Sequence, residues 1–174
     1  MAPYDIRVYG DPVLRRPTGP VDDIDARLVR LSEDMVVTMY EAPGIGLAAP
    51  QVGVQKRLFV YDIGDGPHTI VNPRIDEVRG DWEYEEGCLS VPGLSWIITR
   101  PDEVHLVGLD LDGNEVSIEA NELLGRLFQH ELDHLNGVLL TDHLDDQQRR
   151  EAKKTLRERA MGTAPAPAAH RGAL

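Results

Sequence analysis

Hydrophobic positions recur at helical spacing near the N-terminus. The apolar residues there follow one another at steps of three or four: Ile24, Leu28, Leu31, Met35 and Met39. This spacing places them on one face of an amphipathic helix over about residues 23–40. Asp22 or Asp23 can cap its start, and Ala42-Pro43-Gly44 ends it.

Short runs rich in β-branched and aromatic residues follow this helix and predict strands. The runs span residues 57–61, 69–71, 96–99, 104–109 and 115–118. Asp112-Gly113-Asn114 separates the last two runs and is typical of a hairpin turn. A helix followed by several short strands and then by further helices indicates an α+β fold.

Two further helices are predicted in the C-terminal part of the chain. One spans about residues 121–136 and ends at Gly137, which suits a left-handed cap, and the other covers about 145–160. Small residues and prolines follow, so we predict a disordered tail over 161–174. We expect one α+β domain over residues 1–160. Its short mixed or antiparallel strands should surround the central helix, with an N-terminal and a C-terminal helix beside them.

The composition favours a reducing, aqueous compartment. Cys88 is the only cysteine among the 174 residues, which excludes an intramolecular disulfide. The chain has no run of about eighteen apolar residues, the minimum for a membrane helix. Its N-terminus lacks a basic start followed by an apolar stretch, so no secretory or transit peptide is predicted. We expect a cytoplasmic protein without a membrane partner.

Charge is distributed unevenly along the chain. The 18 basic and 30 acidic residues give a net charge of −12, which argues against binding DNA or an anionic membrane over the whole surface. Residues 149–174 nevertheless hold seven basic and two acidic residues, a net of +5, while the other 148 residues have a net of −17. The acidic part is therefore not expected to contact nucleic acid.

An H-E-x-x-H motif, residues 130–134, lies on the predicted central helix. Helical spacing of four residues puts His130 and His134 on one face, where both imidazoles can bind the same metal ion. Glu131 lies beside the first histidine, within reach of a water molecule on that ion. The alternative is a pair of surface histidines on an amphipathic helix.

A catalytic metal site needs a third protein ligand. The metalloprotease extension of this motif places a histidine where this chain has Leu140, and His143 lies three residues too late. Cys88 is the better candidate, because one thiolate and two imidazoles form a tetrahedral site with one open position. A lone cysteine is otherwise most often a small core residue.

A third segment, residues 44–53, is rich in small residues that let a ligand approach the backbone closely. Gln51 within it offers an uncharged amide donor. The glycine spacing is not that of a phosphate-binding loop, and Pro50 interrupts the helix that a dinucleotide fingerprint requires. Taken alone, the segment fits either a packed turn or a ligand-binding loop.

Together these three segments resemble the peptide deformylase family. Its motifs G-x-G-L-A-A-P-Q, E-G-C-L-S and Q-H-E-x-D-H-L-x-G are similar to residues 44–51, 86–90 and 129–137. Their order and separation also fit, so the resemblance covers about residues 5–160. It implies a deformylase-like catalytic domain over 1–160 that removes the N-formyl group from the formyl-methionine of nascent polypeptides and releases formate.

The resemblance also implies a role for each motif residue. The metal ligands would be Cys88, His130 and His134. The ion would be ferrous iron, although zinc, nickel or cobalt can occupy the same ligands. Glu131 would act as general base and acid while metal-bound hydroxide attacks the formyl carbon. The Gln51 amide and the Leu89 backbone N–H would stabilise the oxyanion.

Metal-bound imidazoles need hydrogen-bond partners that orient them. We predict that Glu86 accepts a hydrogen bond from His130, and that Asp133 pairs with Arg100. The alternative for both acids is an ordinary solvated carboxylate.

The substrate methionine needs an apolar slot. Leu127 lies on the same helix face as the two histidines, and with Ile45 and the bare backbone of Gly46 it is predicted to wall that slot. The alternative for Leu127 is a plain core position.

Two other functions fit part of the pattern. A zincin-type metallopeptidase requires a third ligand downstream of His134 instead of Cys88. A non-catalytic metal-binding module requires that Glu131 be dispensable.

The basic helix at Arg149–Arg159 suggests a partner. Because a deformylase acts on chains that leave the ribosome, we predict that this helix contacts the ribosome. A solvated helix face with a basic C-terminal end is the alternative.

Overall fold

A computed structural model describes residues 2–163 and residue 174. The helices are α1 (Ala26–Glu41), α2 (Glu122–Leu135) and α3 (Asp146–Ala160). The strands are β1 (Gly46–Ala48), β2 (Leu58–Tyr61), β3 (His68–Arg79), β4 (Trp82–Cys88), β5 (Val91–Arg100), β6 (Glu103–Leu109) and β7 (Glu115–Ala120). Three short 3-10 helices join them: η1 (Pro12–Arg15), η2 (Ala49–Val52) and η3 (Leu140–His143). The α+β class predicted from the sequence is confirmed.

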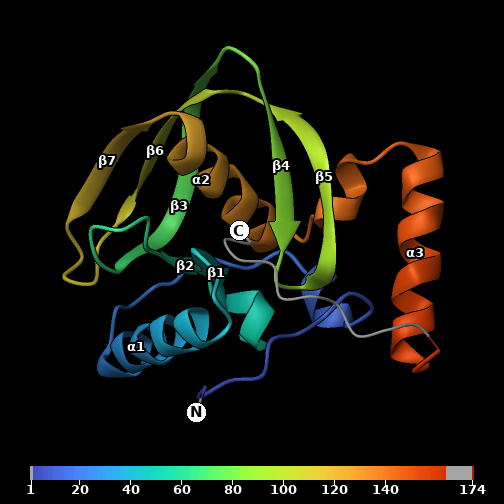
Figure 1. The fold of residues 1–174 in the computed structure, drawn as a ribbon. Coiled ribbons are helices and arrows are strands. Elements are labelled where there is room, and N and C mark those ends of the chain that lie inside the picture. Colours follow the sequence, from blue (N-terminus) through green and yellow to red (C-terminus); the bar gives the residue numbers. More distant parts are fainter. Residues whose placement is uncertain (1, 164–173) are drawn as a thin grey trace.

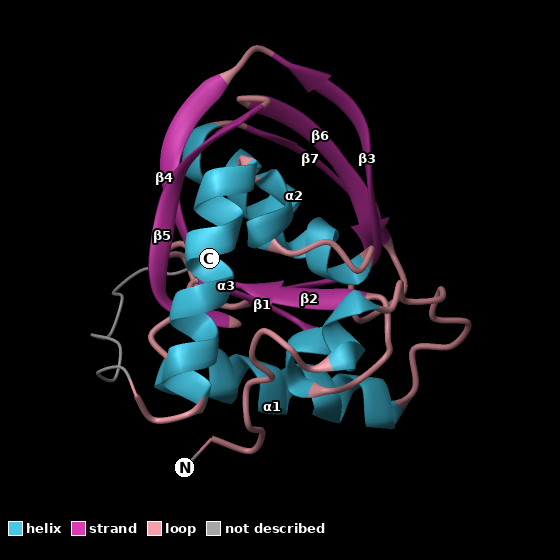
Figure 2. Cartoon of the chain, turned by 90° about the vertical axis from the view of Figure 1, so that its right-hand side faces the viewer, coloured by secondary structure: helices cyan, strands magenta, loops and turns pink. Residues whose placement is uncertain are grey.

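The strands form two antiparallel sheets around α2. Five strands pair in the order β1-β2-β3-β6-β7, and β4 pairs with β5 in a separate hairpin. Figures 1 and 2 show α2 between the five-stranded sheet and the β4–β5 hairpin, with α1 beyond β1 and β2. The helix α3 lies outside the hairpin (Figure 1). A central helix enclosed by strands, with one helix on either side, matches the predicted arrangement.

The start of α1 differs from the prediction. Asp25 caps this helix, because its side chain accepts hydrogen bonds from the amides of Arg27 (3.1 Å) and Leu28 (2.9 Å). The prediction that Asp22 or Asp23 caps it was wrong. Ile24 therefore precedes the helix, although it still packs against the same apolar cluster as α1.

The strands are longer and more numerous than the hydrophobic runs indicate. β3 continues eight residues past the predicted end at Val71, because its polar second half pairs with β6. The prediction also missed β1 and β4: the first has only three residues, and the second carries acidic side chains between aromatic ones. β5 begins at Val91 despite its proline and glycine, because within the described residues it pairs with β4 alone and one of its edges is free of ladder hydrogen bonds.

Three apolar clusters lie in the interior of the part of the chain that the structure describes. The first joins α1 to β1 and β2, the second packs α2 against the five-stranded sheet, and the third joins the β4–β5 hairpin to η3 and α3. None of the described helices is long and apolar enough to cross a membrane.

The predicted tail over 161–174 falls mostly outside the described residues, which omit 164–173. Leu174 is described, and its side chain is buried in the second apolar cluster. Figure 1 marks this end of the chain near β1 and α2. The boundary at residue 160 stays a prediction.

Candidate metal centre

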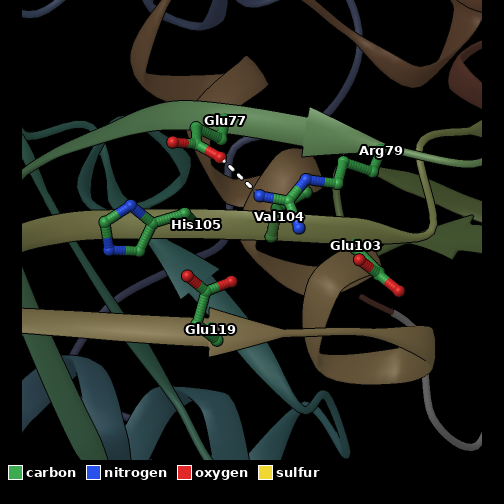
Figure 3. A pocket seen from close by; sticks show the side chains of 6 residues that line it. All are labelled: Glu77, Arg79, Glu103, Val104, His105 and Glu119. Carbon is green, nitrogen blue, oxygen red and sulfur yellow. Dashed lines mark hydrogen bonds and ion pairs between the residues drawn. The ribbon is translucent and has the colours of Figure 1, made fainter.

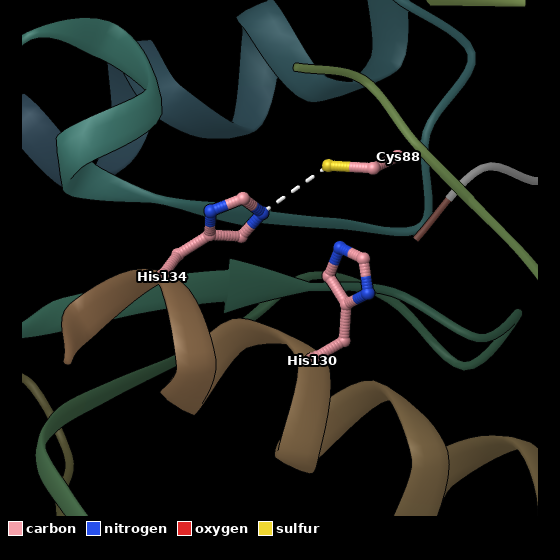
Figure 4. Close-up of side chains that lie close together, drawn as sticks. All are labelled: Cys88, His130 and His134. Carbon is pink, nitrogen blue, oxygen red and sulfur yellow. Dashed lines mark hydrogen bonds between the residues drawn. The ribbon is translucent and has the colours of Figure 1, made fainter. Parts of the chain in front are cut away.

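Two histidines and the cysteine converge in the interior of the chain (Figure 4). His130 and His134 lie one turn apart on α2 with ring centroids 5.0 Å apart, and Cys88 reaches them from the end of β4. The Cys88 Sγ is 3.3 Å from Nε2 of His134. One potential ligand atom from each residue lies within 4.8 Å of the others, and all three side chains are buried. The spacing on α2 and the position of the hairpin thus bring Cys88, His130 and His134 together. These are the residues that the sequence predicts as ligands.

A register irregularity lies next to Cys88 in the β4–β5 hairpin. Along the β4–β5 hairpin Glu86 pairs with Trp96 and Gly87 with Ser95, but Cys88 pairs with Val91. The irregularity falls between Gly87 and Cys88, and residues 92–94 of β5 are the extra ones opposite it, just beside the tight turn. Leu89 follows directly in that turn, so its backbone lies beside the cysteine.

The electrostatics of the cluster suit a divalent cation. Burial raises the pKa of the Cys88 thiol, but the two imidazoles outweigh it and lower this pKa to about 5. The chain therefore favours the thiolate, the form that binds metals. Nε2 of His130 is buried without a hydrogen-bond partner in the described structure, as expected of a ligand atom. A soft thiolate with two imidazoles fits iron, zinc, nickel or cobalt.

Glu131 lies in the same buried region without a protein partner. Its side chain is 0% exposed, and neither carboxylate oxygen has a hydrogen bond within the described structure. Burial raises the pKa of Glu131 to about 7, although the neighbouring imidazoles oppose this shift. A buried carboxylate that titrates near neutrality suits a group that takes up and releases a proton.

The absence of a side chain at Gly46 makes room for this carboxylate. A Cβ built at Gly46 would lie 3.0 Å from Cδ of Glu131 and closer still to Oε1. No real Cβ tolerates that approach without displacing its neighbour. Gly46 was predicted to wall the substrate slot, and the structure places it directly against Glu131.

Gln51 lies in η2, beside the cluster. Its Oε1 accepts a hydrogen bond from the Ala48 amide (2.8 Å), while its Nε2 donates to Oγ of Ser90 (3.2 Å) and lies 3.9 Å from Sγ of Cys88. The carbonyl end is thus fixed, and the amide end faces the metal cluster. Ser90 was not singled out from the sequence.

The predicted partner of His130 is in place. Oε2 of Glu86 lies 3.1 Å from Nδ1 of His130, which leaves Nε2 to face the cluster. Glu86 also accepts hydrogen bonds from Nε (2.7 Å) and Nη2 (3.0 Å) of Arg100. Burial opposes its ionisation, yet His130 and Arg100 hold the pKa of Glu86 well below its usual range. The carboxylate is therefore a charged, fixed acceptor.

The predicted pair of Asp133 and Arg100 is also present. Nη1 of Arg100 donates to Oδ2 of Asp133 at 2.8 Å. Nε2 of His143, which lies too late in the chain to fit the metalloprotease extension of the motif, is 2.7 Å from the same oxygen. Burial raises the pKa of Asp133, but His143 and Arg100 outweigh it, and the pKa is lowered.

The residues proposed for the substrate slot lie at the second apolar cluster. Leu127 is 0% exposed within it, and Ile45 packs against it from the segment before β1. The burial of Leu127 is what a core position also requires, so its role in a slot stays a prediction.

A second group of charged side chains lies on the surface of β3, β6 and β7 (Figure 3). It holds Glu77, Arg79, Glu103, His105 and Glu119 around a hollow of about 10 Å³. Such a hollow holds one water molecule at most. Within the described residues, Cys88, His130 and His134 are the one group with ligand atoms close enough to share a metal ion.

Comparison with known proteins identifies the family of this arrangement. The sequence model described as polypeptide deformylase matches residues 3–150. A peptide deformylase of Clostridium botulinum is 54% identical over 142 residues, 82% of this chain and 97% of that protein. One from Acidothermus cellulolyticus is 47% identical over 158 residues, covering 91% and 88%.

Solved structures agree with these sequence matches. The crystal structure of a peptide deformylase from Legionella pneumophila superimposes with a TM-score of 0.87 at 41% identity, covering 93% of this chain and 99% of that one. A Synechococcus elongatus peptide deformylase, crystallised in complex with actinonin, gives a TM-score of 0.85 at 37% identity and covers 97% and 94%. Sequence, fold and the convergence of three motifs lead to one conclusion: this chain belongs to the polypeptide deformylase family of enzymes.

Proposed function

We propose that this enzyme hydrolyses the formyl amide of N-formyl-methionine at the start of nascent polypeptides and releases formate. The observation that carries the proposal is the unpartnered Glu131 carboxylate, buried beside the Cys88, His130 and His134 cluster. Amide hydrolysis requires an activated water, a stabilised oxyanion and a proton for the leaving nitrogen. The cluster itself, the Glu131 carboxylate, the Gln51 amide and the Leu89 backbone N–H are proposed to meet these three requirements.

The cluster fits a divalent metal ion, which we expect to be ferrous iron, with zinc, nickel or cobalt as substitutes. Cys88 Sγ and the Nε2 atoms of His130 and His134 are the donor atoms that face one another. When bound, such an ion lowers the pKa of a coordinated water and polarises the substrate carbonyl. Three protein ligands leave an open position, as catalytic sites do.

Glu131 moves the proton in the proposed reaction. Its carboxylate accepts a proton from the attacking water and passes it to the departing nitrogen, so that an amine leaves. A pKa of about 7 supports this role, since the group then exchanges its proton readily near neutral pH. The missing side chain at Gly46 leaves the space that this carboxylate occupies.

Gln51 and Leu89 donate to the developing oxyanion. The Gln51 amide is oriented through its carbonyl end, and its 3.2 Å hydrogen bond to Ser90 is long enough to exchange for a stronger acceptor. The backbone N–H of Leu89 comes from the turn that follows the cysteine. Fixed donors of this kind act on charge that appears only in the transition state.

Ile45, Gly46 and Leu127 are proposed to wall the slot for the methionine side chain. Ile45 and Leu127 belong to one apolar cluster beside α2, which supports an apolar contact. Side chains beyond the first residue of the substrate differ between nascent chains, so we expect loose selectivity there.

The zincin alternative has less support. Its third ligand would come from the acids downstream of His134, of which Asp142 is nearest. Asp142 instead accepts hydrogen bonds from Arg15 and from the Leu139 amide (2.9 Å). The membership in an enzyme family argues against a non-catalytic module.

Formate release from a formyl-Met dipeptide tests the proposal. The purified protein is loaded with ferrous iron under anaerobic conditions, and its metal content is measured alongside turnover. We expect formate from the formylated dipeptide and no hydrolysis of the same dipeptide with a free amino end. Metal-loaded protein that releases no formate would overturn the proposal, and cleavage of the free dipeptide would favour the peptidase.

We also infer that the enzyme works in the cytoplasm, where nascent chains are made, and that α3 contacts the ribosome. Arg150, Lys153, Lys154 and Arg157 are exposed on α3 and line one hollow of about 350 Å³ with Glu158 and Met161. Arg149 is engaged elsewhere, because it donates to the carbonyls of Thr141, Asp142 and Leu144. Nζ of Lys154 lies 3.9 Å from Oε1 of Glu158, a weak exposed pair, and phosphates can reach all four exposed cations.

A further inference from the structure

Arg126 is a buried cation close to the metal cluster that neither the motifs nor the catalytic proposal uses. It lies four residues before His130 on α2 and is 0% exposed, the largest of the fully buried side chains. A buried guanidinium is costly unless its donors are paired. Its partners therefore indicate what it does.

The guanidinium of Arg126 holds three points of the β4–β5 hairpin. Nη1 donates to Oε1 of Glu86 and to the carbonyl of Ile98, both at 2.9 Å. Nη2 donates to the carbonyl of Trp82, and the guanidinium carbon lies 5.3 Å from the centre of the Trp82 ring. One side chain of α2 thus contacts both strands of the hairpin.

The same two elements carry the metal ligands. Cys88 comes from β4, two residues after Glu86, whereas His130 and His134 come from α2. The distance between thiolate and imidazoles therefore depends on how the hairpin lies against the helix. Arg126 links them directly, and its hydrogen bonds to Glu86 and Ile98 are buried.

Arg100 makes a second link, but of a different kind. It belongs to β5 and reaches α2 only through Asp133, whose side chain is 23% exposed. Its two hydrogen bonds to Glu86 stay within the hairpin. Loss of Arg126 would thus leave Glu86 paired with Arg100 and free to move with the hairpin, away from Nδ1 of His130.

We propose that Arg126 is a positioning residue for the metal centre. It fixes the Glu86 carboxylate and the Cys88 strand against α2, so that Nδ1 of His130 stays bonded and its Nε2 keeps facing the cysteine. The residue does not touch the reacting atoms. The inference rests on the proposed metal site, but it holds whatever reaction that site catalyses.

Metal retention tests this role without reference to turnover. The full chain is loaded with Co²⁺, and the rate of metal transfer to a chelator is measured with the thiolate–cobalt absorption. Partners of ligating histidines typically change metal affinity ten- to a hundredfold. We expect Arg126→Met to release cobalt roughly ten- to a hundredfold faster. Arg126→Lys, which keeps the charge but loses the forked donors, should fall between this variant and the parent.

A general loss of stability must be separated from lost positioning. Met35→Ala removes a fully buried side chain in the first apolar cluster, away from the metal cluster, and serves as the destabilised control. The proposal requires that this control retain cobalt like the parent while the Arg126 variants do not. Equal rates for Met35→Ala and Arg126→Met, or an unchanged rate in Arg126→Lys, would overturn it.

The double variant Glu86→Gln, Arg126→Lys tests whether Arg126 acts through Glu86. We expect it to lose cobalt more slowly than the product of the two separate effects would give, because part of the effect of Arg126 runs through Glu86 and the rest through the carbonyls of Ile98 and Trp82. Additive effects would mean that Arg126 acts elsewhere and would refute the proposed route. Since cobalt release is read optically, a failed formate assay would leave this result intact.

Discussion

At the scale of single residues, the chemistry of the site depends on groups that the fold buries without protein partners. Glu131 is the clearest case, because burial places its pKa near neutrality while no described donor stabilises its charge. An unpaired buried carboxyl costs folding free energy when it ionises. Replacing Glu131 should therefore lower turnover and raise the free energy of unfolding.

Glu131→Gln tests this opposition. We expect turnover to fall by roughly 10²- to 10⁴-fold with metal still bound, as for the loss of a general base. In the folded metal-free chain the pKa is raised from 4.5 to about 7, so the stabilising contribution of the protonated carboxyl is complete below pH 4.5 and is lost as the pH rises through 7. The glutamine variant should then be more stable by about 3 kcal/mol above pH 8.

Denaturant unfolding of the metal-free proteins from pH 4 to 8.5 measures the stability difference. The exposed carboxyl Glu33 on α1 provides a control, Glu33→Gln, for which the difference should stay near zero throughout. A Glu131→Gln variant that is less stable than the parent at pH 8 would contradict the expected ionisation.

Gly46→Ala tests the space that holds this carboxylate. The added Cβ displaces the Glu131 side chain, while the backbone of Gly46 lies outside the left-handed region and accepts alanine. We expect turnover to fall by about a hundredfold, since a misplacement of about 1 Å costs that much, with metal content unchanged. Steady-state kinetics and metal analysis measure both, and Gly19→Ala, which meets no atom within 4 Å, is the control.

At the scale of elements, the H-E-x-x-H helix and its end could be predicted, because their signals are local. Helical spacing puts His130 and His134 on one face whatever surrounds them, and Gly137 takes the expected left-handed cap with φ of +75°. The capping residue of α1 was missed because three acidic residues precede that helix. β4 was missed because its pairing with β5 decides its conformation.

The end of α2 gives a prediction about stability. A Cβ at Gly137 would lie 2.6 Å from the carbonyl oxygen of Arg15, whereas one at Gly162, which has a similar φ of +70°, would meet nothing within 4 Å. We expect Gly162→Ala to lower the free energy of unfolding by about 1 kcal/mol at most, from backbone strain alone. Gly137→Ala should lose about 2–3 kcal/mol, since the contact adds to the strain.

Urea unfolding of both variants measures these losses. Equal losses would show that the left-handed backbone alone sets the cost and that the contact between α2 and the Arg15 segment relaxes freely.

At the scale of the whole molecule, the exposed basic residues and the metal cluster lie on different elements. The metal cluster lies within the enclosed α2 region, while the exposed cations of α3 lie on a helix outside the hairpin (Figure 1). A chain with a net charge of −12 can therefore present a basic surface without exposing its site to nucleic acid.

Replacement of α3 cations tests the proposed ribosome contact. We expect the parent protein to co-sediment with ribosomes at low salt and to be released as salt rises. Lys153→Ser with Arg157→Ser should bind less and show a weaker salt dependence, by roughly one phosphate contact per residue. Activity on a free formyl-Met dipeptide should not change, because both side chains are exposed on α3 and neither belongs to the metal cluster.

Two exposed cations on α1 supply the matched control. Arg27→Ser with Arg30→Ser removes the same charge from another helix and should leave co-sedimentation unchanged. If both pairs weaken binding equally, net charge and not the α3 surface governs the association.

The sequence by itself predicted the central helix and the residues that come together on it, with His130, His134 and Cys88 close to one another and Glu131 beside them, because these depend on short motifs and on helical spacing. It also predicted that Glu86 contacts His130, although 44 positions separate them. Only the tertiary structure decided that Gly46 faces Glu131, that Arg126 joins α2 to the hairpin and that His143 contacts Asp133. These contacts follow from strand register and from how the hairpin lies against α2, which local patterns do not encode.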